Sequence, residues 1–280
     1  MKPARRIPPT RGAAAERRAL RRILVATDGT AASRGALTVA RVLARRDGAV
    51  IDVVCVLPPW SPPPNAREFR RAIGDPMAAR LTRVLRQCHR TLGDVAWTVR
   101  PIEGGVAAGI GDMASAGGHD LVVVGLPRRG VDAWVDRLLR PPTALGVARR
   151  TDVPVLAVPA TAAALPTRAV AGMEDVPAAR VARRAALEVA IVHSDLHGTA
   201  TARELLAHAR AANADLIVLG CRPPASLRRR LWGGVSRRVV GSAECSVLLA
   251  RPAHAREAER PIGAAATGHA TLTLPPAEVA

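Results

Sequence analysis

One short polar segment of the chain combines residue types that suit ligand binding. Asp28-Gly29-Thr30 follows the apolar run ILVAT at 23–27, and an amphipathic helical pattern then continues through Ala44. A carboxylate at the exit of a strand can accept hydrogen bonds from a ribose or a base, while the start of the next helix offers N–H groups to phosphate. The same residue types also form a turn and a helix cap without any ligand. Ligand contact and local capping are therefore both open readings of this segment.

The elements that position this segment alternate between strand and helix. After 23–27, further apolar runs stand at 49–56, 95–99, 121–125 and 153–158, with helical patterns ending near Leu92, over 104–116 and over 138–149. The runs are continuous rather than alternating, which is typical of parallel strands buried on both faces. We expect an α/β fold, an open parallel five-stranded sheet with helices on both faces. In such a sheet the ligand crevice lies at the carboxyl ends of the strands, where Asp28 and Gly125 would meet.

An internal repeat predicts a partial second copy of the same unit. HDLVVVG at 119–125 recurs as ADLIVLG at 214–220, and PVLAV at 154–158 recurs as SVLLA at 246–250. Only one helical segment, 176–188, separates the first strand of the second copy, 168–172, from a strand at 189–193. A helix, a strand and another helix fill that interval in the first copy, so the second copy is short by about one helix-strand unit. It must therefore lean on the first domain, and we expect antiparallel pairing of the last strands of the two copies.

These boundaries divide the chain into four parts. They are a basic tail at 1–21, a complete domain at 22–159, a truncated copy at 168–251 and a second tail at 253–280.

Three segments resemble the universal stress protein family: ILVATDGTAASRGAL at 23–37, EGGVAAGIGDMASAGGHDLVVVG at 103–125 and VPVLAV at 153–158. The resemblance implies a five-stranded parallel sheet, pairing of domains through their last strands and, in some members, ATP binding. It predicts a cytoplasmic stress-response or regulatory protein that binds ATP or AMP weakly, if at all. We expect it to act through a homodimer or a regulatory protein partner rather than as an enzyme.

Both copies depart from the phosphate motif of the nucleotide-binding members, which is Gly, two residues, Gly, nine residues, then Gly before Ser or Thr. In the first copy Arg128 replaces the second glycine, and Pro141-Pro142 stand where Gly-Ser would lie. In the second copy Pro223 takes that glycine's place, although the spacing from Gly220 to Gly233 is kept. Proline has no N–H to donate, so the phosphate cradle is impaired. The candidate contact residues are Thr27, Asp28, Gly29, Thr30, Gly125, Arg128, Arg129, Gly130, Gly220, Gly233 and Gly234.

Composition supports an alternative function, binding of nucleic acid or another polyanion. The chain carries 41 basic and 23 acidic residues, a net charge of +18, and every basic residue except Lys2 is arginine. Arginines crowd the segments after both glycine motifs and could clamp phosphate directly: Arg128, Arg129, Arg137, Arg140, Arg222, Arg228, Arg229, Arg230, Arg237 and Arg238. Genome composition or a solvated helix face explains the same arginines. Aromatic residues are scarce, which weakens binding of single strands by stacking.

Other patterns point away from metal, catalysis and membranes. The four cysteines form no CxxC pair, which favours a reducing compartment and neither a zinc site nor a disulfide framework. His193 and His197 flank Asp195 without an identifiable third ligand, so we expect a structural polar loop rather than a metal site. No Walker-type, HExxH or GxSxG motif is present, and a nucleotide hydrolase would lack a metal-binding carboxylate set. No apolar stretch reaches the roughly 20 residues of a membrane span, so we expect no membrane insertion.

Overall fold

The structure, a computed structural model, is described over residues 19–57, 76–126, 142–172, 190–194, 202–220 and 233–250. The first copy contains β1 (Arg22–Ala26), the 3-10 turn η1 (Ala31–Ser33), α1 (Arg34–Asp47), β2 (Val50–Leu57), α3 (Pro76–Leu92), β3 (Trp97–Glu103), α4 (Val106–Ala116), β4 (Leu121–Gly125), α6 (Thr143–Ala148) and β5 (Val155–Val158). The second copy contains β6 (Arg168–Gly172), β7 (Ala190–Ser194), α8 (Ala202–Ala211), β8 (Leu216–Gly220), α9 (Gly233–Ser242) and β9 (Ser246–Ala250).

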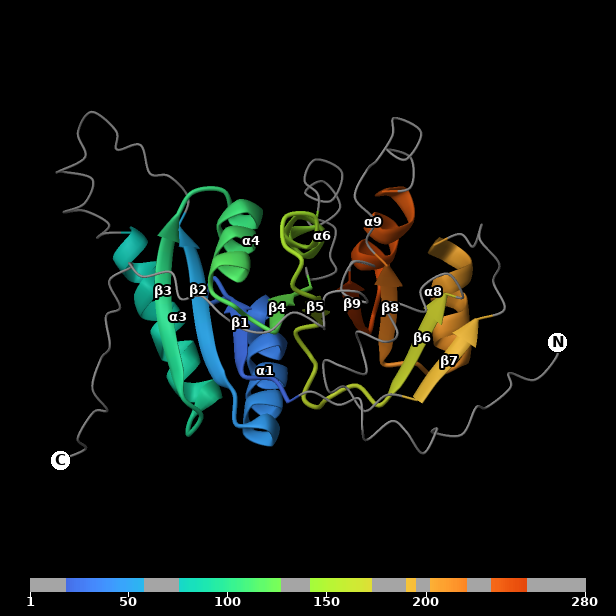
Figure 1. The fold of residues 1–280 in the computed structure, drawn as a ribbon, viewed down its shortest axis with the longest axis horizontal. Coiled ribbons are helices and arrows are strands. Elements are labelled where there is room, and N and C mark those ends of the chain that lie inside the picture. The colour runs from blue at the N-terminus through green and yellow to red at the C-terminus, as the bar shows by residue number, and fades with distance from the viewer. Residues whose placement is uncertain are drawn as a thin grey trace.

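The strands of both copies form a single nine-stranded sheet in the order β3-β2-β1-β4-β5-β9-β8-β6-β7 (Figure 1). Strands are parallel within each copy, and β5 pairs with β9 in antiparallel fashion through Leu156 opposite Leu248. The predicted antiparallel contact between the last strands of the copies is therefore confirmed, as is the five-stranded parallel unit.

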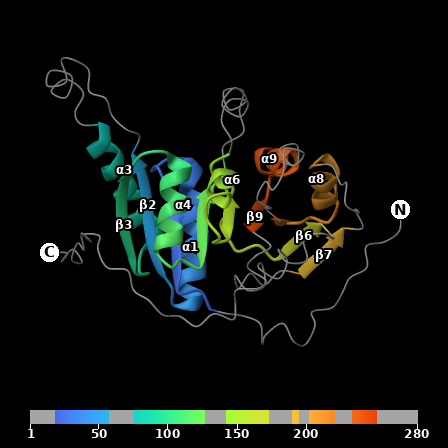
Figure 2. The same cartoon turned by 45° about the horizontal axis from the view of Figure 1, so that its top comes forward.

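Two apolar layers cover the sheet, one on each face, because neighbouring residues of a strand point to opposite sides. Ile23 and Val25 of β1 pack in the layer that includes α1 and α3, whereas Leu24 packs in the layer that includes α4, α6, α8 and α9 (Figure 2). All three side chains are fully buried. α1 ends where Gly48 takes the left-handed conformation at φ 71°, and the chain then enters β2. The layers hold the carboxyl ends of the first-copy strands in fixed register.

The truncation of the second copy falls at the outer end of its sheet. By its place in the sequence repeat, the strand near 189–193 corresponds to the third strand of the first copy. In space β7 instead pairs directly with β6, as β2 pairs with β1. Among the described residues, no strand follows β7 in the position that β3 holds beside β2. The predicted helix at 176–188 lies outside the described residues.

Candidate functional site

The turn after β1 and the end of β4 meet at the point where the strand connections diverge. β1 and β4 are neighbours, with Ala26 opposite Val124, so Thr27 and Gly125 come next on adjacent strands. The chain leaves β1 through α1 on one face of the sheet toward β2, and it leaves β4 through α6 on the other face toward β5. Ligands of open α/β sheets bind in the crevice at such a switch point. The sequence thus predicted correctly that the residues 27–30 and Gly125 share one edge.

The Asp28 carboxylate folds back onto its own turn. Its Oδ1 accepts a hydrogen bond of 2.9 Å from the Thr30 amide and one of 2.7 Å from the Thr30 hydroxyl. This is the Asx-type bonding that stabilises turns and helix starts. Oδ2 has no hydrogen-bond partner among the described residues, so one oxygen serves the turn and the other bonds to none of those residues. The local reading of Asp28 is therefore realised, and it leaves one acceptor for a ligand.

Gln87 of α3 secures the same turn, a contact that the sequence did not reveal. Its Nε2 donates to the Thr30 carbonyl at 2.8 Å, and its Oε1 lies 3.0 Å from the Thr27 hydroxyl and 3.3 Å from the Ser33 hydroxyl. The Thr27 and Ser33 hydroxyls lie 2.7 Å apart and are both buried. Helical spacing does place Gln87 one turn after the buried Val84, which is the only sequence signal that it faces inward.

Two glycines at this edge are required by geometry. Gly29 has φ 77°, in the left-handed region, and a Cβ there would lie 3.0 Å from Arg83 Cγ. A Cβ at Gly125 would lie 2.6 Å from the Ala32 carbonyl oxygen, so the end of β4 packs directly against η1. The space that the absent side chain leaves at Gly125 is thus occupied by the protein backbone. Close packing therefore accounts for this candidate contact residue being a glycine.

Two arginines of α3 add positive charge beside the turn. Arg80 donates from Nη1 to the Val56 carbonyl at 3.4 Å, and the stem of Arg83 passes next to Gly29. Both arginines are at least partly exposed. Cys55 lies close by and is fully buried; burial raises the pKa of its thiol, with Arg80 lowering it and Asp28 raising it. Cys55 is accordingly a neutral core residue, and Arg80 and Arg83 are cationic side chains beside Cys55 and Gly29 respectively.

The segment that would hold phosphate lacks a backbone N–H donor at Pro142. Pro142 caps α6 through its carbonyl, which accepts hydrogen bonds from the amides of Leu145 and Gly146, and its own nitrogen carries no hydrogen. Arg128, Arg129 and Gly130 lie outside the described residues.

In the second copy the candidate glycines lie at the end of one strand and at the start of one helix. Gly220 ends β8, and Gly233 and Gly234 are the first residues of α9. β6 ends at Gly172 beside β8, so the carboxyl edge of this copy is formed. The residues 173–175, which would stand where Asp28 does, lie outside the described residues.

A buried polar cluster joins four elements near the amino ends of the strands, away from this crevice. Asp52 of β2 lies 2.6 Å from Arg22 Nη2 and 3.0 Å from His119 Nε2, and it accepts a hydrogen bond of 2.7 Å from Thr98. Burial by itself raises the pKa of Asp52, but the hydrogen bonds from His119, Thr98 and Arg22 outweigh it and hold that pKa well below its usual range. The cluster ties β1, β2, β3 and the start of β4 together.

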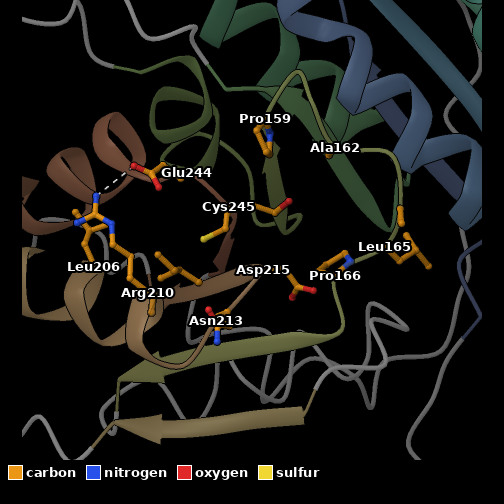
Figure 3. Close-up of a pocket in the computed structure, with 15 residues that line it drawn as sticks. Pro159, Ala162, Leu165, Pro166, Leu206, Arg210, Asn213, Asp215, Glu244 and Cys245 are labelled. Carbon is orange, nitrogen blue, oxygen red and sulfur yellow. Dashed lines mark hydrogen bonds and ion pairs between the residues drawn. The ribbon is translucent and has the colours of Figure 1, made fainter.

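A cavity of about 580 Å³ lies where β5 ends and β8 and β9 begin (Figure 3). The segment from Pro159 to Pro166 forms one wall, and Leu206, Asp215 and Cys245 line the other. Its charged groups bond within the protein, since Asp215 accepts hydrogen bonds from the amides of residues 167 and 168. Burial raises the pKa of the Cys245 thiol to about 11, so this sulfur is a poor nucleophile. The cavity marks the junction of the two copies.

The described residues contain neither a metal-binding cluster of side chains nor a membrane-spanning helix. No group of three or more His, Cys, Asp or Glu side chains there could hold a metal ion. No helix in the described ranges is long and apolar enough to cross a membrane.

Comparison with known proteins places the chain in a family. The model of the universal stress protein family matches residues 19–159 and again residues 160–251. A universal stress protein from Archaeoglobus fulgidus has a similar structure, with a TM-score of 0.61 at 15% identity over 82% of this chain and 96% of that chain. A functionally unknown protein from Pseudomonas aeruginosa aligns with a TM-score of 0.54 at 15% identity over 84% of this chain and 93% of that chain. A search of curated proteins finds no match to the chain.

Proposed function

Because the chain belongs to the universal stress protein family, we propose that it is a stress-response protein whose first copy holds ATP or AMP weakly at the switch point of its sheet. The observation that carries the proposal is the meeting of the 27–30 turn with the end of β4. That edge offers an Asp28 oxygen without a partner among the described residues for a ribose or base, at the position where open α/β sheets hold nucleotides. We infer a non-catalytic role in the cytoplasm, exerted through a protein partner.

Weak binding follows from the phosphate side of the crevice. Pro142 supplies no amide, and each charge-assisted hydrogen bond that is missing removes roughly 1.5–3 kcal/mol. Arg80 and Arg83 lie at the same edge and can contact phosphate in place of backbone amides. Binding that relies on partly exposed guanidinium groups is screened by salt more than binding to a backbone cradle. The affinity for ATP should therefore fall as the salt concentration rises.

Calorimetry of ATP and AMP against the wild type and three variants tests the proposal. Asp28→Ala removes both carboxylate oxygens, while Asp28→Asn keeps an oxygen for the Thr30 amide but loses the charge. We expect a loss of affinity of about tenfold for Asp28→Ala, equivalent to one hydrogen bond of about 1.4 kcal/mol. The matched control is Asp112→Ala, which removes an exposed carboxylate on α4. No heat with either nucleotide at millimolar concentration, or binding that survives Asp28→Ala, would show that the site is wrongly assigned.

The polyanion alternative rests on arginines that fall mainly outside the described residues. Of the cluster at 222–238, only Arg237 and Arg238 are described, and both are exposed on α9. A better-defined set of arginines lies on the first copy.

A further inference from the structure

A groove between α1 and α3 collects four arginines. It has a volume of about 390 Å³ and is lined by Arg34, Arg41 and Arg45 of α1 and by Arg90 of α3, with Ala163 of the connecting segment at its side. The groove lies on the side of α1 and α3 away from β1 and β2, and it begins at Arg34, directly after η1. None of its lining residues belongs to the 27–30 turn.

One carboxylate opposes these four cations within the described residues. Asp94 accepts hydrogen bonds of 2.7 Å and 3.1 Å from Arg45 and one of 3.2 Å from Arg41. The bonds from Arg45 and then Arg41 lower the pKa of Asp94, so it is ionised at neutral pH. Arg34 makes no side-chain bond with the described residues, and Arg90 donates only from Nε to the Arg86 carbonyl. The groove therefore keeps a surplus of positive charge.

The side chain of Arg41 is held against the turn after α3. Arg41 crosses the turn after α3, so that a Cβ at Gly93 would lie 3.3 Å from Arg41 Nη2. Its Nε is shielded from water and has no acceptor among the described residues. That N–H is out of reach of an anion in the open groove, so the groove arginines would contact an anion through their terminal guanidinium nitrogens.

We propose that this groove binds an oligophosphate chain. The positions 34, 41 and 45 follow one face of α1 and span about 16 Å at the helical rise of about 1.5 Å per residue, which suits a linear anion with regularly repeated charges. Arginine is the side chain best matched to phosphate oxygens. No aromatic ring lines the groove among the described residues, so a base would have nothing to stack on. The groove would therefore bind the phosphate chain rather than a base. Inorganic polyphosphate and the backbone of a nucleic acid both supply this chemistry.

The test measures binding of full-length protein to fluorescent inorganic polyphosphate and, separately, to a single-stranded oligonucleotide over a range of salt concentrations. Arg34→Gln combined with Arg90→Gln should weaken binding at least about tenfold and flatten the slope of log K against log salt by about 1.4, at roughly 0.7 for each phosphate that is no longer neutralised. Asp94→Asn should strengthen binding several-fold, because it removes a competing anion and frees two guanidinium groups. A variant that merely damaged the fold would not bind more tightly.

The matched control removes the same charge elsewhere. Arg150→Gln combined with Arg203→Gln alters two exposed arginines, one just after α6 and one on α8. The proposal requires that this pair leave the affinity within about twofold of the wild type. If both double variants lost the same affinity, the net charge of the protein and not the groove would bind the anion. Unchanged affinity of Asp94→Asn would also overturn the proposal. The probe that responds to the groove variants identifies the source of the phosphate chain.

Discussion

Asp120 and Asp215 make the same reciprocal contact in the two copies. The Asp120 carboxylate accepts a hydrogen bond of 3.0 Å from the Arg22 amide, and its own amide donates to the Arg22 carbonyl at 2.9 Å. Asp215 repeats this with Arg168 at 2.7 Å and 3.0 Å. In both copies the aspartate before the next-to-last strand, β4 or β8, therefore fixes the start of the first strand. The sequence repeat of 119–125 and 214–220 therefore preserves this contact between the aspartate and the first strand.

Replacing Asp215 tests how much this contact stabilises the junction. Asp215→Ala leaves the amides of Thr167 and Arg168 and the Thr167 hydroxyl without their acceptor, so we expect the free energy of unfolding to fall by about 2 kcal/mol. Asp215→Asn keeps an acceptor oxygen and should lose less. Urea unfolding followed by circular dichroism measures both. A loss below about 0.5 kcal/mol for Asp215→Ala would mean that water replaces the carboxylate without penalty.

The sequence predicted the strands, the repeat and the pairing of the copies because each depends on local or repeated patterns. LVVVG and LIVLG are continuous apolar runs, and both became buried parallel strands. The place of β7 was not predictable in the same way. The sequence order of strands does not state which strand lies beside which, and losing one unit let β7 pair with β6 instead of keeping the third position.

The candidate site was predicted in part. Asp28 and Gly125 carry signals in residue type and spacing, and the sheet brings them to one edge. Arg80 and Arg83 carried no such signal, and Gln87 carried only its helical spacing from Val84, because all three come from a helix far along the chain whose contacts depend on tertiary packing. Gly125 was named as a candidate contact residue, and its close approach in the structure is to the Ala32 carbonyl.

The continuous sheet predicts that the two copies unfold together. Leu248 of β9 is fully buried opposite Leu156, and Leu37 of α1 is fully buried in the first copy. Leu248→Ala and Leu37→Ala should each lower the free energy of unfolding by about 2–5 kcal/mol and shift one and the same transition. Denaturant unfolding followed by circular dichroism and by limited proteolysis checks this. Two transitions, each sensitive to only one of the substitutions, would indicate independent domains.

The Asp52 cluster predicts a loss of stability in acid. The folded pKa of Asp52 is lowered, so its contribution is complete above the unfolded value of about 3.9 and is lost as the pH falls below it toward the folded value. Asp52→Asn removes this titration, so its free energy of unfolding should decline less than that of the wild type between about pH 5 and pH 3. At pH 7 the variant should be less stable, because His119 and Arg22 lose a charged partner. Parallel pH profiles of both proteins would contradict the assignment.

Gln87 should support nucleotide binding through the turn that it holds. Its amide group bonds the Thr30 carbonyl and lies within hydrogen-bond distance of the Thr27 hydroxyl, so Gln87→Ala releases both ends of the segment that carries Asp28. We expect ATP affinity to fall about three- to tenfold, since a turn that must be ordered on binding loses part of the binding free energy. Thr82→Ala, an exposed change on the same helix, is the control and should leave the affinity unchanged. Calorimetry of ATP against both variants, at a temperature where circular dichroism shows each fully folded, separates the turn from global stability. If Gln87→Ala binds ATP as the wild type does while Asp28→Ala does not, then the Asp28 oxygen contacts the nucleotide without needing the turn to be held by α3.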